Sequence, residues 1–545
     1  MKKKKSYFGI LLLTLSLLTW WYGMNLIVSS SLHLDIGLSM SHGSWTDMTV
    51  KVYIDDISIY FLSTILLVSS CVLTYSGCYM GNSQYNYFIS ILFMFILSML
   101  ILSVSGSLFI SILSWDLLGV TSVFLILYFE TWKSLKSSLV TFMVNRVGDM
   151  FMMFSLMMTQ SMNPGLSSWQ FSALLLVCIS TKSAQIPFSL WLPLAMQAPT
   201  PVSSLVHSST LVTAGVYLMI RYNSMIPSQV MSIALLLGSA SLLYSGVMAT
   251  LESDLKKLIA YSTLSHISLI MISISQGLVS AGMLHLMAHA FFKSMLFMVA
   301  GWVIHGSGDS QDIRFLELSW SSNPLLSSFL FISLASMAGL PLSSGFCSKE
   351  YIVTSNLSGM TLTPFFMITL MGVSLCAAYS LRLGLTISKF TSNNSNKCCN
   401  SMPLSVSLPL LVGSGMSMIY GYWFMTFNLG APKEDLSIYS DFMIKISLIS
   451  SLLTGLVWGM IGSVYSPGSS MTKSQIFMSS WAESLSPSLE VLIHRSSLMD
   501  LSGWTDNLFS QINVLSNLSS SKEQSSLYSA LKVWLILSIV VYMLS

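Results

Sequence analysis

The sequence predicts an all-α polytopic membrane protein of about fifteen transmembrane helices, with two broken helices in inverted repeats and a lateral surface helix. Three observations predict this fold. Of the 545 residues, 53% are hydrophobic and only 8% are charged, whereas soluble domains carry about 25% charged residues. Apolar runs of roughly 18 residues or more recur along nearly the whole chain. Two of these runs contain a proline close to a lysine.

The apolar runs define the expected spans in chain order. Proline interrupts two of them, near Pro187 and near Pro341, and each break has a lysine nearby, Lys182 or Lys349. Paired interrupted helices of this kind indicate inverted repeats. The expected spans are 8–30, 57–80, 86–105, 107–129, 135–158, 170–197, 200–222, 230–251, 256–275, 279–305, 324–358, 363–387, 406–427, 441–464 and 527–545.

The tail differs in composition from the rest of the chain. Charged residues there alternate with Trp, Leu, Ile and Phe, too polar to span a bilayer and typical of a helix lying along the membrane or across neighbouring helices. We therefore expect six segments, which are N-terminal spans 1–106, a first repeat 107–251, a second repeat 252–390, C-terminal spans 391–473, a lateral amphipathic helix 474–526 and an anchor 527–545.

Ionisable residues inside the expected spans are the candidates for chemistry, because burying charge in a membrane is costly and such residues usually mark an ion path. Asp116 needs a partner or a proton, and Lys182 is the natural partner. We expect an Asp116–Lys182 pair that opens and closes as the lysine proton leaves; a static structural pair is the alternative. Arg146 and Asp149, three residues apart, form either a local salt bridge or a functional pair.

A stripe of His285, His289 and Lys293 lies on one helix face, since these residues follow i, i+4, i+8 spacing. Histidine exchanges protons near neutral pH, so the stripe predicts a proton relay. Structural hydrogen bonding and a metal site remain alternatives, although no third metal ligand with suitable spacing is evident.

Six further residues complete the candidate set. His207 and His266 stand alone in apolar helices, where a histidine is more often a satisfied core group, but His207 directly follows the first break. The adjacent lysines Lys256 and Lys257 at a helix start fit a solvated face, and one of the two could point inward. Lys349 and Glu350 lie beside the second break and are expected to end a path toward one membrane face. These residues are His207, His266, Lys256, Lys257, Lys349 and Glu350.

Several classes of function find no support in the sequence. A net charge of +3 is too small to indicate a nucleic-acid partner. The seven cysteines form no CxxC pair, and we find no phosphate-binding glycine loop, hydrolytic triad or paired-carboxylate site. We expect no cofactor and no metal in this chain.

Basic residues predict the orientation of the chain. Placing the N-terminus on one side puts most loop lysines and arginines there, including Lys2 to Lys5, Lys133, Lys136 and Arg314, and leaves only Lys51, Arg221 and Lys433 on the other. By the positive-inside rule the N-terminus faces the matrix or cytoplasm, and an odd number of spans puts the C-terminus on the opposite side.

Eight sequence blocks resemble the chain 5 family of mitochondrial NADH:ubiquinone oxidoreductase, respiratory complex I. The resemblance covers roughly residues 50–390, and the tail fits chain 5 better than the shorter antiporter-like chains 2 and 4. The blocks are Trp-Asp-x-x-Gly (115–119), Asn-Arg-Val-Gly-Asp (145–149), Lys-Ser-Ala-Gln-Ile-Pro (182–187), Ala-Pro-Thr-Pro-Val-Ser-Ser-Leu-Val-His (198–207), Asp-Leu-Lys-Lys-Leu-Ile-Ala-Tyr-Ser-Thr (254–263), His-Leu-Met-Ala-His-Ala-Phe-Phe-Lys (285–293), Gln-Asp-Ile-Arg (311–314) and Gly-Phe-Cys-Ser-Lys-Glu (345–350).

This resemblance implies a proton-pumping subunit of the membrane arm in the mitochondrial inner membrane. It implies that the two repeats are antiporter-like, that FMN, iron–sulfur clusters and the quinone site belong to partner subunits, and that chains 4 and 2, accessory subunits and lipid such as cardiolipin are partners. It assigns an acid–lysine pair to Asp116 and Lys182, and the hydrated axis to residues His207, Lys257, His285, His289, Lys293 and Lys349.

The sequence departs from the family pattern at a few positions. Asp116 is a glutamate in many members, and His266 stands where glutamine is common, which adds a titratable group to the path or none at all. A second candidate, an Mrp-type monovalent cation/proton antiporter subunit, shares the same core. The antiporter subunits that carry extra C-terminal membrane domains differ from this sequence, which ends at residue 545.

Overall fold

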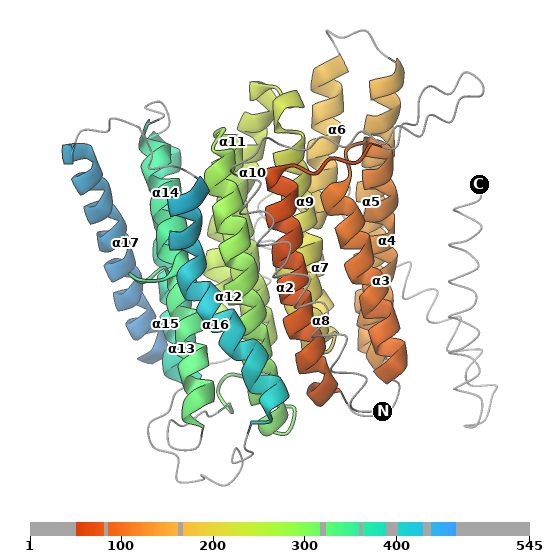
Figure 1. The fold of residues 1–545 in the computed structure, drawn as a ribbon. Coiled ribbons are helices and arrows are strands. Elements are labelled where there is room, and N and C mark those ends of the chain that lie inside the picture. Colours follow the sequence, from red (N-terminus) through yellow and green to blue (C-terminus); the bar gives the residue numbers. More distant parts are fainter. Residues whose placement is uncertain are drawn as a thin grey trace, which may run out of the picture. The chain divides into compact units, whose positions relative to one another are not determined.

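The structure, a computed structural model, describes residues 51–80, 85–161, 167–316, 323–358, 363–387, 402–428 and 438–464. Within these ranges the chain is helical, and pairing between extended residues is limited to isolated bridges such as Val52 with Ser105. The helices lie side by side and run roughly parallel to one another (Figure 1). Ten helices in the described part are long and apolar enough to cross a membrane. The predicted all-α membrane fold is therefore confirmed.

All but two of the expected spans fall within the described residues, and each of these coincides with one helix or with a series of helical segments. The spans 8–30 and 527–545 and the lateral helix 474–526 lie outside the described residues. The long helices are α2 (Asp56–Tyr79), α3 (Tyr85–Val104), α4 (Leu108–Ile126), α5 (Trp132–Ser161), α6 (Ser167–Lys182), α9 (Leu211–Arg221), α10 (Ser228–Leu251), α11 (Leu255–Ser275), α12 (Val279–Gly306), α13 (Pro324–Ala338), α14 (Ser344–Ser358), α15 (Thr363–Ile387), α16 (Leu404–Asn428) and α17 (Ile438–Val464).

Short helical segments join some of these helices. The first break is followed by η2 (Phe188–Leu190), α7 (Trp191–Leu194) and η3 (Ala195–Gln197), and the next span consists of α8 (Thr200–Leu205), a π-helical segment η4 (Val206–Thr210) and α9. Elsewhere, η1 (Leu127–Phe129) extends α4 and η5 (Asn223–Met225) follows α9.

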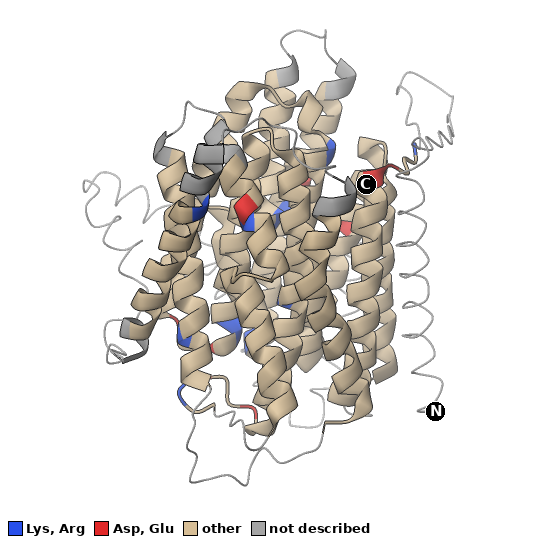
Figure 2. Ribbon diagram, turned by 60° about the vertical axis from the view of Figure 1, so that its left-hand side comes forward, with Lys and Arg blue, Asp and Glu red and all other residues tan. Residues whose placement is uncertain are grey.

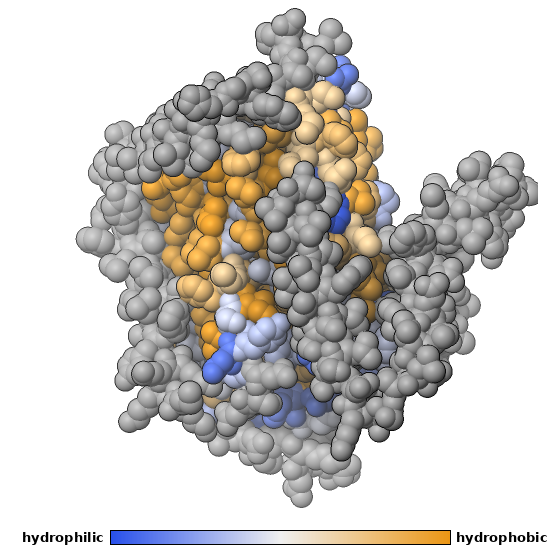
Figure 3. Space-filling model, turned by 90° about the vertical axis from the view of Figure 1, so that its right-hand side faces the viewer, coloured by the Kyte–Doolittle hydropathy of each residue, from blue (hydrophilic) through white to orange (hydrophobic). Residues whose placement is uncertain are grey.

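Helix α12 is the central element of the described part, since it packs against α2, α8, α11, α13, α14 and α16. The most apolar stretches of α11 and α12 are 94% buried, compared with 33% for α5 at the edge. Large apolar side chains such as Met94, Leu411 and Trp458 instead point outward. Hydrophobic residues cover much of the coloured surface of one face, as expected for contact with lipid (Figure 3).

The first break follows the end of α6 at Lys182. Ala184 adopts a left-handed conformation with φ of 54°, and the amide of Gln185 donates to the carbonyl of Ser180 at 3.0 Å, which is the geometry of a Schellman cap. The indole of Trp191 donates to the carbonyl of Thr181 at 2.8 Å. The break therefore leaves its backbone carbonyls facing protein donors, the condition under which non-helical backbone is tolerated at membrane depth.

The second break separates α13 from α14 and has the same kind of cap. Gly339 adopts φ of 83°, and the amide of Leu340 donates to the carbonyl of Ala335 at 3.0 Å. A Cβ added at Gly339 would lie 3.0 Å from Cδ of Lys349. Glycine is thus required here both for the left-handed turn and for the approach of the lysine. Both predicted breaks are confirmed, whereas the inverted relation of the two repeats stays a prediction.

Replacing Gly339 with alanine should destabilise the protein, because a left-handed residue with a Cβ costs roughly 1–2 kcal/mol and the methyl group would also press on Lys349. The midpoint of thermal unfolding in detergent measures this effect. Gly415→Ala is the matched control, since a Cβ there meets no atom within 4 Å and helical alanine is favoured over glycine by about 0.5–1 kcal/mol. Equal midpoints for the two variants would contradict the role assigned to Gly339.

Candidate functional site

A row of ionisable side chains lies buried among the helices. All members of the row are at most 2% exposed, and Figure 2 shows charged residues at only a few positions among the helices. Each such group must be surrounded by hydrogen-bond partners or by other charges to remain buried. The row consists of Lys182, His207, His266, His285, His289, Lys293 and Lys349.

Lys182 begins the row at the end of α6. Its ammonium donates to the carbonyl of Trp115 on α4 at 2.5 Å and lies 3.9 Å from the centre of the Trp115 ring. A desolvated ammonium above an indole gains about 2 kcal/mol or more. Trp115, which the sequence did not single out, therefore provides both contacts that hold the lysine in this position.

The expected ion pair between Asp116 and Lys182 is not formed. Within the described residues, the salt bridge of Asp116 runs to Arg146 on α5 at 3.6 Å, and Arg146 also contacts Asp149 at 3.1 Å. Consecutive helical residues point about 100° apart, so Trp115 faces Lys182 while Asp116 turns toward α5. Both carboxylates still act electrostatically on Lys182. That the pair opens and closes as the lysine proton leaves stays a prediction.

A glycine lets α5 approach the end of α6. A Cβ at Gly148 would lie 2.2 Å from the hydroxyl of Thr181, the residue before Lys182. The salt bridge between Arg146 and Asp149 expected from their spacing is present. The block Asn-Arg-Val-Gly-Asp therefore combines a helix contact with a charge cluster beside the lysine.

His207 lies in the π-helical segment η4. Its ring is fully buried and lies 6.3 Å from the ring of Trp191, and neither ring nitrogen has a hydrogen-bond partner among the described residues. A π-bulge in a helix is frequently found at functional sites. The segment η4 packs against α12, which brings this histidine to the helix that carries the stripe.

Of the two adjacent lysines at the start of α11, Lys256 and not Lys257 has its side chain in the interior. Lys256 is 5% exposed, and its ammonium donates to the carbonyl of Ala198, at the end of the first break, at 3.1 Å. Lys257 forms a salt bridge with Asp254 at 2.7 Å and its side chain is 39% exposed. The assignment of Lys257 to the axis is thus corrected, because only Lys256 lies on the inward face of α11.

The stripe on α12 is buried as a unit, and its ends contact different helices. Lys293 donates to the hydroxyl of Ser262 on α11 at 2.5 Å and contacts the sulfur of Met337 on α13 at 3.0 Å. His285 shares a hydrogen bond of 2.8 Å with the hydroxyl of Ser348 on α14. The stripe predicted from spacing therefore contacts three neighbouring helices, α11 and α14 through hydroxyl groups and α13 through a sulfur atom.

His266 has another histidine as its partner, although it is the only histidine of α11. Its Nδ1 lies 3.1 Å from Nε2 of His285, and both residues are fully buried. Helices α11 and α12 form an antiparallel hairpin that turns at Gly277, and the two histidines lie at similar distances from this turn. Comparing positions across the hairpin would have revealed the pair.

Lys349 ends the row at the second break. Its ammonium donates to the carbonyls of Met337 and Ala338 at 2.8 and 3.0 Å, and these are the last carbonyls of α13, where the helix dipole favours a cation. Glu350 points away and lies 3.8 Å from Lys445 on α17. Of the two expected residues, Lys349 therefore lies in the interior and Glu350 at the edge.

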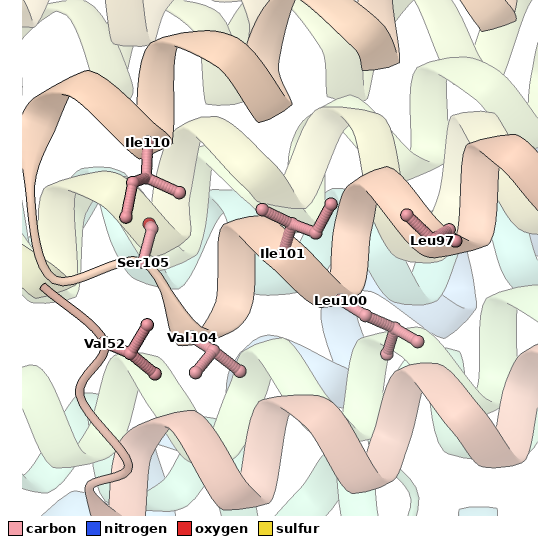
Figure 4. A pocket seen from close by; sticks show the side chains of 7 residues that line it. All are labelled: Val52, Leu97, Leu100, Ile101, Val104, Ser105 and Ile110. Atoms are coloured by element: carbon pink, nitrogen blue, oxygen red, sulfur yellow. The ribbon is translucent and has the colours of Figure 1, made fainter. Parts of the chain in front are cut away.

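Other chemistry has little support in the described part. Within these residues no group of three His, Cys, Asp or Glu side chains is placed to hold a metal ion. A groove of about 340 Å³ at the ends of α3 and α4 is lined by aliphatic side chains and Ser105 (Figure 4). It contains no proton-carrying residue. The buried row is instead a series of bases, hydroxyls and carbonyls that can hold and pass protons.

Comparison with known proteins gives consistent results. The family model described as "NADH:quinone oxidoreductase/Mrp antiporter, TM" matches residues 105–376. Proteins named NADH-ubiquinone oxidoreductase chain 5 are similar over most of the chain. The one from Aedes aegypti is 37% identical, covering 75% of this chain and 73% of that protein. The one from Mytilus edulis is 34% identical, covering 78% of each.

Two solved structures share the fold. A chain of the Mrp complex from Dietzia sp. aligns with a TM-score of 0.73 at 20% identity, and the alignment covers 100% of this chain and 62% of that one. A chain of the archaeal membrane-bound sulfane sulfur reductase aligns with a TM-score of 0.68 at 19% identity, covering 84% and 93%. At these identities the likeness concerns the fold alone.

Replacing Lys256 with methionine should slow proton translocation by the reconstituted assembly, whereas Lys257→Met should change it little. Only Lys256 faces the interior, where it contacts the first break, while Lys257 lies at the surface. Proton uptake into vesicles distinguishes the two variants, each of which removes one positive charge at adjacent positions. A larger loss in Lys257→Met would show that the geometric assignment is wrong.

Proposed function

Because the chain belongs to the NADH-ubiquinone oxidoreductase chain 5 family, we propose that it is a proton-translocating membrane-arm subunit of that enzyme. In this role it couples electron transfer elsewhere in the complex to proton pumping across the mitochondrial inner membrane. The support comes from relatives that are 34–41% identical and from the multi-pass helical fold.

The observation that carries the proposal is the continuous burial of protonatable groups from the first break to the second. Lys182 lies at one break and Lys349 at the other, with the residues of α11 and α12 between them. A structural scaffold would gain nothing from burying them, since each ionisable group in a membrane costs several kcal/mol unless it is paired or neutral. A pump requires such groups, because each has to exist in two protonation states.

The residues have different tasks in this scheme. Lys182 holds a proton when the carboxylates of Asp116 and Asp149 act on it, and their arrangement around Arg146 determines how strongly they do so. Movement of Asp116 between Arg146 and Lys182 would raise or lower the free energy of the lysine proton. Lys256 and His207 lead from the first break to α12, and Lys349 receives the proton at the second break.

The enzyme's redox chemistry belongs to other subunits in this proposal. This chain contributes no redox active site, and FMN and iron–sulfur clusters reside in partner subunits. Its membrane-arm neighbours are the antiporter-like chains 4 and 2, accessory subunits and lipid such as cardiolipin. The N-terminus faces the matrix and the C-terminus faces the intermembrane space, as the distribution of basic residues predicts.

An Mrp-type cation/proton antiporter subunit is the second candidate, because the solved Mrp chain has the same fold with a TM-score of 0.73. The sequence is far more similar to chain 5 proteins, at 37% identity to the Aedes aegypti protein, than to that Mrp chain, at 20%. This difference in identity favours a role as a subunit of the NADH-oxidising complex over a role as an antiporter subunit.

Lys182→Met should lower the number of protons translocated per electron in the assembled enzyme, because methionine fills the same space but carries no proton. Electron transfer should fall less than translocation. Removing a positioned acid or base typically costs a factor of about 10²–10⁴ in rate. Proton uptake and NADH oxidation, measured together in proteoliposomes, test this expectation.

Lys182→Arg separates the charge of the lysine from its ability to release a proton, since arginine keeps the charge but does not release a proton in proteins. We expect it to lower translocation as well. An unchanged proton-to-electron ratio in fully assembled Lys182→Met enzyme would contradict the proposed function. Recovery in Lys182→Arg alone would limit the lysine to a purely electrostatic role.

A further inference from the structure

We propose that His266 carries protons between His289 and His285 of α12, forming a relay in the order His289, His266, His285 and Ser348. This inference rests on the proposed function and extends it to a residue of α11. The geometry that supports it is the contact of one imidazole with both histidines of the stripe.

The first link is a direct contact between two rings. Nδ1 of His266 lies 3.1 Å from Nε2 of His285, and the two rings are nearly parallel with centroids 5.3 Å apart. One of these nitrogens carries a hydrogen and the other accepts it. A proton that reaches His266 therefore has an acceptor already in place on α12.

The second link is the approach of His289 to the other side of His266. Their ring centroids are 5.8 Å apart. Nε2 of His266 and both ring nitrogens of His289 are buried and have no hydrogen-bond partner among the described residues. Buried polar nitrogens without partners are rare and costly. These nitrogens are available to each other, directly or through one bridging water.

A phenylalanine restricts the other directions. The ring of Phe292 packs edge-on against His266 at 5.1 Å and against His289 at 5.6 Å. This apolar wall leaves the histidines to exchange protons among themselves.

The third link leads out of the histidine cluster. Nδ1 of His285 and the hydroxyl of Ser348 share a hydrogen bond of 2.8 Å, and Ser348 directly precedes Lys349 in α14. The exit thus lies beside the lysine that caps the second break. Without His266, a proton would have to pass between His289 and His285 along α12, where side chains four residues apart are separated by about 5–6 Å at Cβ.

The proton balance of the relay is simple. His266 accepts a proton at Nε2 and releases the one at Nδ1 to Nε2 of His285, which in turn releases its Nδ1 proton to Oγ of Ser348 as that hydroxyl passes its own hydrogen to a water molecule. Each ring ends in the opposite tautomer and returns by exchanging its hydrogen before the next transfer. No bond between heavy atoms changes, and no oxidant or reductant is needed.

His266→Gln tests the relay in the assembled enzyme. Glutamine can donate and accept hydrogen bonds, as histidine does here, but it does not take up a proton near neutral pH. We expect proton translocation in proteoliposomes to fall about tenfold or more, with the assembly intact. Normal translocation in His266→Gln would overturn the relay, since hydrogen bonding alone would then be sufficient.

His305→Gln is the matched control, because His305 lies on the same helix α12 but stacks on Trp302 at its end. It should translocate protons normally, and an equal loss in both variants would overturn the relay. If His266→Gln does not assemble, Ser348→Ala decides instead: slowed translocation supports the relay and a normal rate overturns it. If Lys182→Met loses proton translocation while His266→Gln translocates normally, the proposed function stands and only this inference is overturned.

Discussion

A lysine ammonium inside a membrane protein must be surrounded by oxygen acceptors, and much of this structure follows from that need. The second break supplies them for Lys349, and the unbroken helix α4 supplies one for Lys182. Lys349 is held by the last carbonyls of α13, which are exposed because Gly339 ends the helix there. Lys182 lies at the end of α6 and uses the carbonyl and ring of Trp115. Without the second break, Lys349 would face side chains with few acceptors, at a cost of at least about 2.5–3.5 kcal/mol.

The two lysines differ in their charged surroundings. Lys182 lies in the field of Asp116 and Asp149, which share Arg146. Within the described residues, neither Lys293 nor Lys349 forms a salt bridge with a carboxylate, and neutral hydroxyl, sulfur and carbonyl acceptors hold them. The two breaks therefore hold their lysines in different ways, with carboxylates near the first and neutral acceptors at the second.

Most of the fold followed from hydropathy, because a membrane allows few alternatives to long apolar helices. The breaks at Pro187 and Pro341 were predictable because proline interrupts a helix. The stripe on α12 was predictable from the helical spacing of 3.6 residues per turn. The partner of Asp116 was not, since the direction of a side chain around α4 depends on how the helices pack. For the same reason spacing alone did not distinguish Lys256 from Lys257. His266 was among the candidates, but its contact with His285 was not predicted because that partner lies on the next helix.

The assignment to NADH oxidation can be tested without any variant. Gently solubilised membranes can be separated by native electrophoresis, stained for NADH oxidation and analysed by mass spectrometry. The account predicts that this chain migrates in a very large NADH-oxidising assembly together with flavin and iron–sulfur proteins. Migration in a small complex of hydrophobic chains without NADH oxidation would contradict it and would indicate an antiporter instead.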